Sequence, residues 1–266
     1  MPDELISGAT DTQYVPTDPA DLGRFVYCRV RGDNAFGFST ANSNTIGPIA
    51  AASAGFAFIA SAQASGQLGP ITTSVIDTTG ADLLIVGVSQ YEAPGSVTIT
   101  DNKSNTWTGL TIPAGGTTEG RIWYCKPTTV GSGHTVSANV AGGFYGGITF
   151  AAFSGSHVTP FDVQAGNGNN AGTAASAGSL TPSVNGCLVI SNVSNHVTAA
   201  GMPDLTIASG GSGFILLPMV VSTPTSFPQR MAYLVQSTLA AVNPVWTVQE
   251  ASWTAVSASF KSASSG

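Results

Sequence analysis

The sequence predicts an all-β protein, and three observations lead to that prediction. Short runs of Val, Ile, Thr and aromatic residues recur along the chain, with clusters of Gly, Pro, Ser and Asn between them. In several runs apolar and polar residues alternate, which is the period of a half-buried strand. No stretch has the apolar spacing of a convincing amphipathic helix. We therefore expect strands throughout, arranged in packed sheets.

The first expected module is residues 1–46. Val26, Cys28 and Val30 form the apolar row of an alternating strand, and Asp33-Asn34 is typical of a turn after it. Residues 47–55 have the composition of a linker, and nine of the 22 charged residues lie before position 50. The N-terminal segment and the remainder therefore have the composition of two different modules.

The second expected module is a β-sandwich over residues 56–263. Its expected strands are Phe56–Ala62, Ile71–Ile76, Leu83–Ser89, Val97–Thr100, Arg121–Cys125, Thr135–Val140, Gly147–Phe153, Leu188–Val193, Phe214–Leu217, Met231–Gln236, Trp246–Gln249 and Trp253–Phe260. Two pairs of segments resemble each other, 69–89 with 177–194 and 146–156 with 252–262. This echo indicates two similar halves within one sandwich, and a chance match between strands of biased composition is the alternative.

The low charge of the chain favours a protein that packs against neighbours. Only 8% of the 266 residues are charged, against roughly 25% in an average domain. A monomer normally stays soluble through interspersed charge, so we expect a homo-oligomer or a larger assembly. A secreted domain rich in Ser and Thr is the alternative.

Several classes of partner and cofactor are not expected. The net charge of −6 argues against nucleic acid, because no basic stripe could neutralise phosphates. No apolar run is long enough to span a bilayer, so we expect no membrane insertion. Cys28, Cys125 and Cys187 are odd in number and widely spaced, which fits neither a disulfide framework nor a zinc site. We expect no cofactor and no metal.

The N-terminal segment resembles the second half of Ig-like modules found in tailed-phage structural proteins. The matching motifs are the corner Asp21-Leu22-Gly23, the strand end Cys28-Arg29-Val30 and the hairpin Asn34-Ala35-Phe36-Gly37. The strands that normally come first are absent, so the apolar row must be covered by something other than the usual Ig partner. Strands of a neighbouring chain, the sandwich of the same chain and an edge sheet between symmetry mates are the alternatives. The expected docking residues are Val26, Cys28, Val30, Phe36 and Phe38.

The remainder resembles a jelly-roll-like domain frequent in phages and prophages. The matching motifs, in order, are "ADLLIVGVS", "ITDNKSNTWT", "IWYCKP" and "ITFAAFSGS". This resemblance implies a non-enzymatic structural protein of the virion, made in the host cytoplasm and located at the tail tip or on a fibre. A decoration or fibre protein of the head and a glycan-binding adhesion module are the alternatives. A trimer is expected by analogy with fibre-like proteins.

The sequence offers few catalytic candidates. No Gly-x-Ser-x-Gly motif is present to hold a nucleophile, and the histidines lack the short spacing of metal ligands. A carboxylate pair for glycoside hydrolysis would have to come from scattered acids such as Glu92, Asp101, Glu119 and Glu250. "TDNKSNTW" at 100–107 partly imitates a calcium loop, but a tight hairpin turn explains the same residues better.

Two further features concern binding. The Gly- and Asn-rich stretch 165–178 is expected to be a binding loop or a strap across a neighbouring subunit. A candidate glycan platform consists of Trp123, Tyr124 and Tyr145, because sugar rings stack on aromatic side chains. Strand alternation requires one of Trp123 and Tyr124 to point inward and the other outward. Trp246 and Trp253 are expected in the core.

Overall fold

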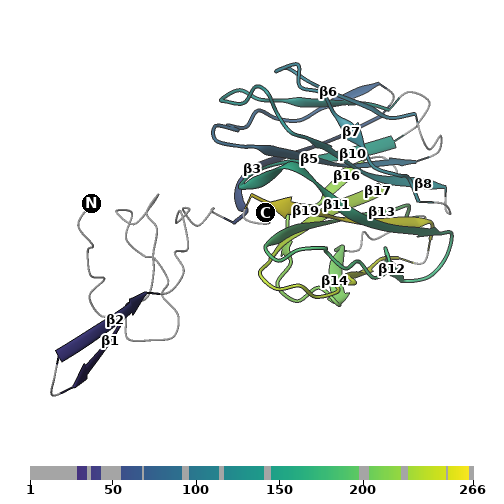
Figure 1. Cartoon of the computed structure of the whole chain (residues 1–266). Coiled ribbons are helices and arrows are strands. Elements are labelled where there is room, and N and C mark those ends of the chain that lie inside the picture. The colour runs from purple at the N-terminus through teal and green to yellow at the C-terminus, as the bar shows by residue number, and fades with distance from the viewer. Residues whose placement is uncertain are drawn as a thin grey trace. The chain divides into compact units, whose positions relative to one another are not determined.

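The computed structural model of the chain describes residues 29–34, 37–42, 55–67, 69–91, 96–113, 117–140, 145–197, 204–222, 227–249 and 251–263. The chain divides into two compact units, Met1–Ser53 and Ala54–Gly266, and the boundary lies within the stretch 47–55. Every regular element in the described segments is a strand, as the sequence predicts (Figure 1). No helix in these segments is long and apolar enough to cross a membrane.

In the first unit the structure describes one antiparallel hairpin. It consists of β1 (Arg29–Asn34) and β2 (Gly37–Asn42), and Asn34 pairs with Gly37. Asp33 and Asn34, predicted as the turn, are instead the last residues of β1, so the chain reverses after them. Gly37 has a φ of +143°, a backbone conformation that favours glycine at the start of the returning strand.

The second unit, which we call the body, consists of two halves with matching strands. The first half contains β3 (Ala57–Gly66), β4 (Pro70–Thr72), β5 (Leu83–Tyr91), β6 (Thr98–Asp101), β7 (Thr108–Gly109), β8 (Thr118–Cys125), β9 (Val136–Asn139) and β10 (Tyr145–Ser154). The second half contains β11 (Ser156–Asn169), β12 (Ala174–Ser176), β13 (Cys187–Asn195), β14 (Thr206–Ser209), β15 (Ile215–Leu216), β16 (Val220–Ser222), β17 (Phe227–Gln236), β18 (Val245–Thr247) and β19 (Trp253–Ser262).

Each half has the strand order of a jelly roll. The first half has a large sheet, β3-β10-β5-β8-β7, and a small sheet, β4-β9-β6. The second half repeats this order with β11-β19-β13-β17-β15 and β12-β18-β14, and its extra strand β16 pairs with β17. When the extra strand β16 is left out of the count, the first, last, third and sixth strands of both halves are neighbours in the large sheet, as in the eight-stranded jelly roll. The echo in the sequence therefore reflects a structural repeat.

The halves pack through their large sheets, so that the small sheets form the two outer layers (Figure 1). One core fills the space between the large sheets, and each half has a second core between its own large and small sheets. The sequence predicts one sandwich for residues 56–263, whereas each half is a sandwich of its own. The reason is that β5 and β13 are buried on both faces, so each large sheet needs a cover on either side.

The Gly-rich stretch 165–178 corrects one prediction. Residues 165–169 are the end of β11, which pairs with β19 as far as Asn169 and Trp253, and residues 174–176 form β12. The prediction of a loop or strap is therefore wrong for these residues. Their Gly and Asn side chains do not favour a strand, but backbone hydrogen bonds to a neighbouring strand keep the segment extended. Trp246 and Trp253 are buried, as predicted.

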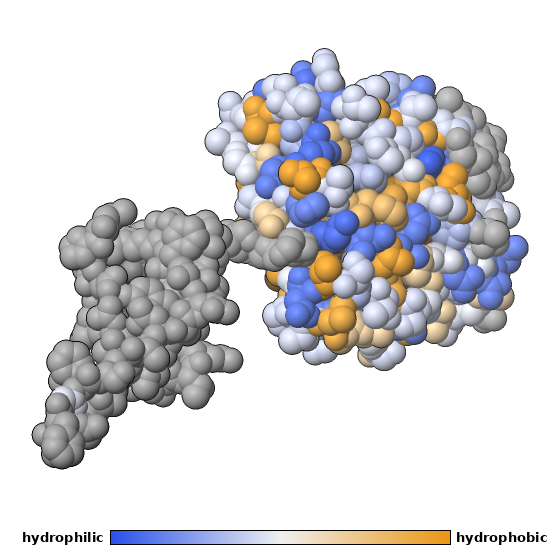
Figure 2. Space-filling model, viewed as in Figure 1, coloured by the Kyte–Doolittle hydropathy of each residue, from blue (hydrophilic) through white to orange (hydrophobic). Residues whose placement is uncertain are grey.

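Figure 2 shows the hydropathy of the residues on one face of the molecule. Much of the visible face of the body is pale, which means that residues of intermediate hydropathy cover it, and the most hydrophobic residues are scattered among them. This agrees with the small share of charged residues in the chain.

Candidate functional site

The three residues of the candidate glycan platform do not come together. Trp123 and Tyr124 lie on opposite faces of β8, and both are partly buried because each face of the large sheet is covered. Tyr124 pairs with Ile85, and Ile85 pairs with Ala151 on β10. Tyr145 begins β10, six residues before Ala151, which places it about 20 Å along the strand from Tyr124.

Trp123 is covered on one face of its ring. The guanidinium carbon of Arg121 lies 4.4 Å from the ring centroid, and the ring packs against the core of the first half. Neither face of Trp123 is therefore an open surface for a ligand.

Tyr124, in contrast, lies in an open groove of about 340 Å³ at the rim between the two large sheets. Its ring stacks on Phe161 with the centroids 5.9 Å apart, and it meets Phe260 edge-on at 5.5 Å. We call this the Tyr124 groove. Its lining residues are Thr106, Thr108, Tyr124, Lys126, Val158, Thr159, Pro160 and Phe161.

Lys126 is the cationic residue of the groove, and its ammonium group is held in place. Lys126 Nζ donates to Ser156 Oγ at 2.8 Å and to the Ser156 carbonyl at 3.3 Å. Asp82 Oδ2 lies 3.9 Å from the same nitrogen, which partly offsets its charge. Since an ammonium group has three N–H donors, one donor remains for another acceptor.

The structural repeat places a second copy of this rim in the other half. Arg121 Nε donates to the Leu110 carbonyl, and Arg230 Nε donates to the Leu217 carbonyl in the same way. β8 in the first half and β17 in the second are therefore equivalent strands, with a constant difference in residue number between equivalent positions. Tyr124 is equivalent to Tyr233, and Lys126 is equivalent to Val235. Thr108 pairs with Tyr124 as Ile215 pairs with Tyr233, so those two residues also correspond.

The second rim keeps the aromatic contacts but not the polar groups. Tyr233 stacks on Phe58 at 5.2 Å and meets Phe153 edge-on at 5.3 Å. The residues around it that are exposed are aliphatic or aromatic: Ile215 is 53% exposed, Val235 39% and Phe58 38%. We call these residues the Tyr233 patch. The two rims thus have equivalent aromatic contacts but differ in the polarity of the exposed residues around them.

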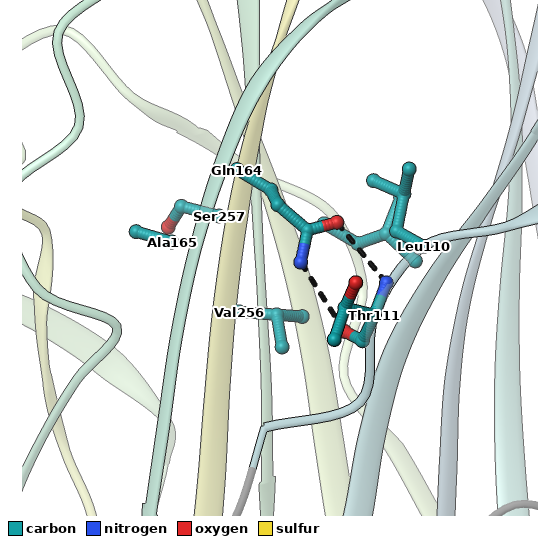
Figure 3. Close-up of a pocket in the computed structure, with 7 residues that line it drawn as sticks. Leu110, Thr111, Gln164, Ala165, Val256 and Ser257 are labelled. Atoms are coloured by element: carbon teal, nitrogen blue, oxygen red, sulfur yellow. Dashed lines mark hydrogen bonds between the residues drawn. The ribbon is translucent and has the colours of Figure 1, made fainter.

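A smaller hollow next to the Tyr124 groove serves the fold. Figure 3 shows the side-chain amide of Gln164 facing Thr111, with two hydrogen bonds between them. Thr111 N donates to Gln164 Oε1 at 3.1 Å, and Gln164 Nε2 donates to the Thr111 carbonyl at 3.5 Å. These bonds join β11 to the segment after β7, across the gap between the large sheets. The hollow leaves no room for a water molecule.

Residues 100–107 form a turn, as the sequence favours, but not a hairpin, because β6 pairs with β9 and β7 pairs with β8. The Asp101 carboxylate accepts hydrogen bonds from Lys103 N, Asn105 N, Asn105 Nδ2 and Trp107 Nε1 at 2.9 to 3.0 Å. Ser104 has a φ of +60°, which is usual in tight turns. Burial raises the pKa of Asp101, but these hydrogen bonds outweigh it, so the pKa lies below its ordinary value.

His134 lies against this turn and is fully buried. Its Nε2 is 3.5 Å from Asp101 Oδ2, and its Nδ1 is 2.9 Å from Thr78 Oγ1. The order Thr, His, Asp resembles a catalytic triad, but both Thr78 and His134 are completely buried. Burial lowers the pKa of His134 below its ordinary value, and the neighbouring Asp101 only partly offsets this effect.

The buried imidazole predicts a loss of stability in mild acid. Below about pH 6.5 the unfolded chain protonates His134 more readily than the folded chain does, because the pKa in the folded chain is lower, so folding stability decreases as the pH falls. One such group contributes at most about 1.4 kcal/mol per pH unit. We expect the free energy of unfolding, measured with urea between about pH 7 and pH 5, to fall more steeply in the wild type than in His134→Gln. Equal slopes would contradict this prediction, because His157 and His196 are common to both proteins.

Two further carboxylates of the body, Asp162 and Asp204, have structural partners. Asp162 accepts hydrogen bonds from the backbone and hydroxyl of Ser183, and Asp204 pairs with Arg230. Glu92 and Glu250 lie outside the described residues. Among the described residues, no cluster of three His, Cys, Asp or Glu side chains could hold a metal ion.

The expected docking residues are described only in part. Val30 lies in β1 and Phe38 in β2, whereas Val26, Cys28 and Phe36 lie outside the described residues.

No protein-family model, curated protein or solved structure matches the chain. The sequence singled out Tyr124 but missed Phe161 and Lys126, because the groove forms only when β8 and β11 meet at the rim.

Proposed function

We propose that the chain is a non-enzymatic structural protein of a tailed-phage virion, associated with the tail tip or a fibre. In this proposal residues 1–53 attach the chain to the particle and the body is displayed. The observation that carries the proposal is the division of the chain at Ser53 and Ala54. The body buries three cores of its own, so the N-terminal unit is available for another role.

Two features of the sequence support this proposal. The motifs quoted above resemble phage structural modules in both units. The small share of charged residues also suits a surface that packs against other subunits. We therefore propose other virion proteins and further copies of this chain as partners.

Light scattering on the full chain and on a chain that starts at Ala54 tests the attachment role. We expect the shortened chain to be a folded monomer and the full chain to associate, because the apolar row of the first unit needs a cover. Val30→Asp in the full chain should then reduce association. Identical behaviour of the full and shortened chains would contradict the proposal.

The location in a virion needs its own test. Antibodies raised against the body should label particles of the phage that encodes the chain, at the tail. Labelling on the head, with a copy number comparable to that of the major capsid protein, would instead favour a decoration protein.

A further inference from the structure

We propose that the Tyr124 groove is a carbohydrate-binding site whose ligand is a neutral hexose unit of a glycan. This inference goes beyond the structural role proposed above. It concerns the body alone, so it can hold or fail independently of the attachment of residues 1–53.

The lining of the groove has the two surfaces that a sugar ring needs. A hexose has an apolar C–H face, which stacks on aromatic rings, and an edge of hydroxyl groups. Tyr124 and Phe161 stack on each other and pack against the core, and the parts of their rings that line the groove supply its aromatic surface. Thr106, Thr108 and Thr159 are exposed along the groove, and their hydroxyls can both donate and accept hydrogen bonds. The groove volume of about 340 Å³ is near the lower end of the range for small-ligand sites.

The second rim shows which of these features the fold itself requires. Tyr233 and Phe58 form the same aromatic stack there, so packing of the two large sheets accounts for the rings. Packing does not account for the polar groups, because Ile215 and Val235 occupy the positions of Thr108 and Lys126 and are exposed. The Thr108 hydroxyl and the Lys126 ammonium group are therefore particular to the Tyr124 groove, and both residues are exposed.

The charges around the groove favour a neutral sugar over an acidic one. Two donors of Lys126 are taken by Ser156, which leaves one for a ligand hydroxyl. Asp82, at 3.9 Å, offsets much of the positive charge that would attract a carboxylate. The chain as a whole carries a net charge of −6, which repels anionic polymers.

The repeat also supplies a matched pair of variants. Thr108→Ile with Lys126→Val gives the groove the side chains of the Tyr233 patch, and the same fold already holds these residues at the equivalent positions. Ile215→Thr with Val235→Lys makes the reverse change at the second rim and serves as the control. The control variant should keep the thermal stability of the wild type, since Ile215 and Val235 are exposed. The groove variant loses the hydrogen bonds of Lys126 to Ser156, so a small decrease in its melting temperature is expected and its folded state is checked by circular dichroism.

The experiment is saturation-transfer NMR on the full chain with the methyl pyranosides of glucose, galactose and mannose. We expect transfer to at least one of them in the wild type and in the control variant, and at least a tenfold weaker affinity in the groove variant. Because the ligand is neutral, added salt should leave the affinity unchanged. Failure of all three sugars to bind would overturn the proposal. Equal binding by the groove variant, or binding that salt abolishes, would also overturn it.

Discussion

Gly87→Val is expected to lower the free energy of unfolding of the body by about 3 kcal/mol. Gly87 lies in the middle of β5, where the two large sheets meet. A Cβ atom at this position would lie 2.6 Å from Asn192 Oδ1 and 3.0 Å from Met231 Sδ, both far closer than van der Waals contact. Valine would add two further methyl groups in the same place.

Asn192 cannot easily move away from the new side chain. Gln229 Nε2 donates to Asn192 Oδ1 at 2.5 Å, and Asn192 Nδ2 donates to the Val88 carbonyl at 3.2 Å. Thr149 Oγ1 in turn donates to Gln229 Oε1 at 3.1 Å. All of these side chains are completely buried, so shifting one of them leaves a buried polar group without its partner.

Urea unfolding followed by tryptophan fluorescence measures the effect, with Gly55→Val as the matched control. A Cβ at Gly55 meets no atom within 4 Å, so we expect that variant to stay within about 0.5 kcal/mol of the wild type. Asn192→Ala added to Gly87→Val should recover part of the loss, because it removes the clashing oxygen. If Gly87→Val were as stable as Gly55→Val, close packing of the large sheets would not limit the residue at this position.

Residues 83–89 and 188–193 show what the sequence could predict. Both runs are apolar at nearly every position, and both are central strands of the large sheets. The same runs also held the clue to the layered arrangement, because a strand that is apolar on both faces needs a cover on each side. The pattern does not show which sheet covers each face of these strands, so the sequence predicts one sandwich where the body has two.

Backbone pairing and rim contacts could not be predicted in the same way. β11 contains the polar run after Ala165, and only its pairing with β19 makes it a strand. The Tyr124 groove combines β8 with Phe161, a residue of the other half. Whether these residues form a groove depends on how the two large sheets pack together, and no local sequence pattern in either segment predicts that packing.

Trp246→Ala is expected to lower the free energy of unfolding by about 3–5 kcal/mol. Trp246 is fully buried in the middle of β18, between Ala175 and Ile207. Its Nε1 donates to Ser191 Oγ at 2.9 Å, and Ser257 Oγ donates to the same hydroxyl at 3.1 Å. Truncation would leave a large cavity between the sheets of the second half.

In the first half the equivalent space between the large and small sheets is filled by a side chain of the large sheet. Ala138 occupies the place of Trp246, because it lies between Ile71 and Ile99 in the small sheet. Phe150 of the large sheet is fully buried and occupies the place of Ser257. At this pair of equivalent positions the large aromatic residue comes from the large sheet in the first half and from the small sheet in the second.

Because the two halves place the large aromatic side chain in different sheets, we expect the effects of Ser257→Phe and Trp246→Ala on the free energy of unfolding to compensate each other in part. Ser257→Phe alone should destabilise the body by about 1–3 kcal/mol, because Trp246 already fills the space. Combined with Trp246→Ala, the same phenylalanine would fill the cavity as Phe150 does in the first half. We expect the double variant to be about 0.5–3 kcal/mol more stable than the sum of the two single effects, as measured by urea unfolding of all four proteins. Strict additivity would mean that the two halves, despite their common connectivity, do not share an interchangeable core.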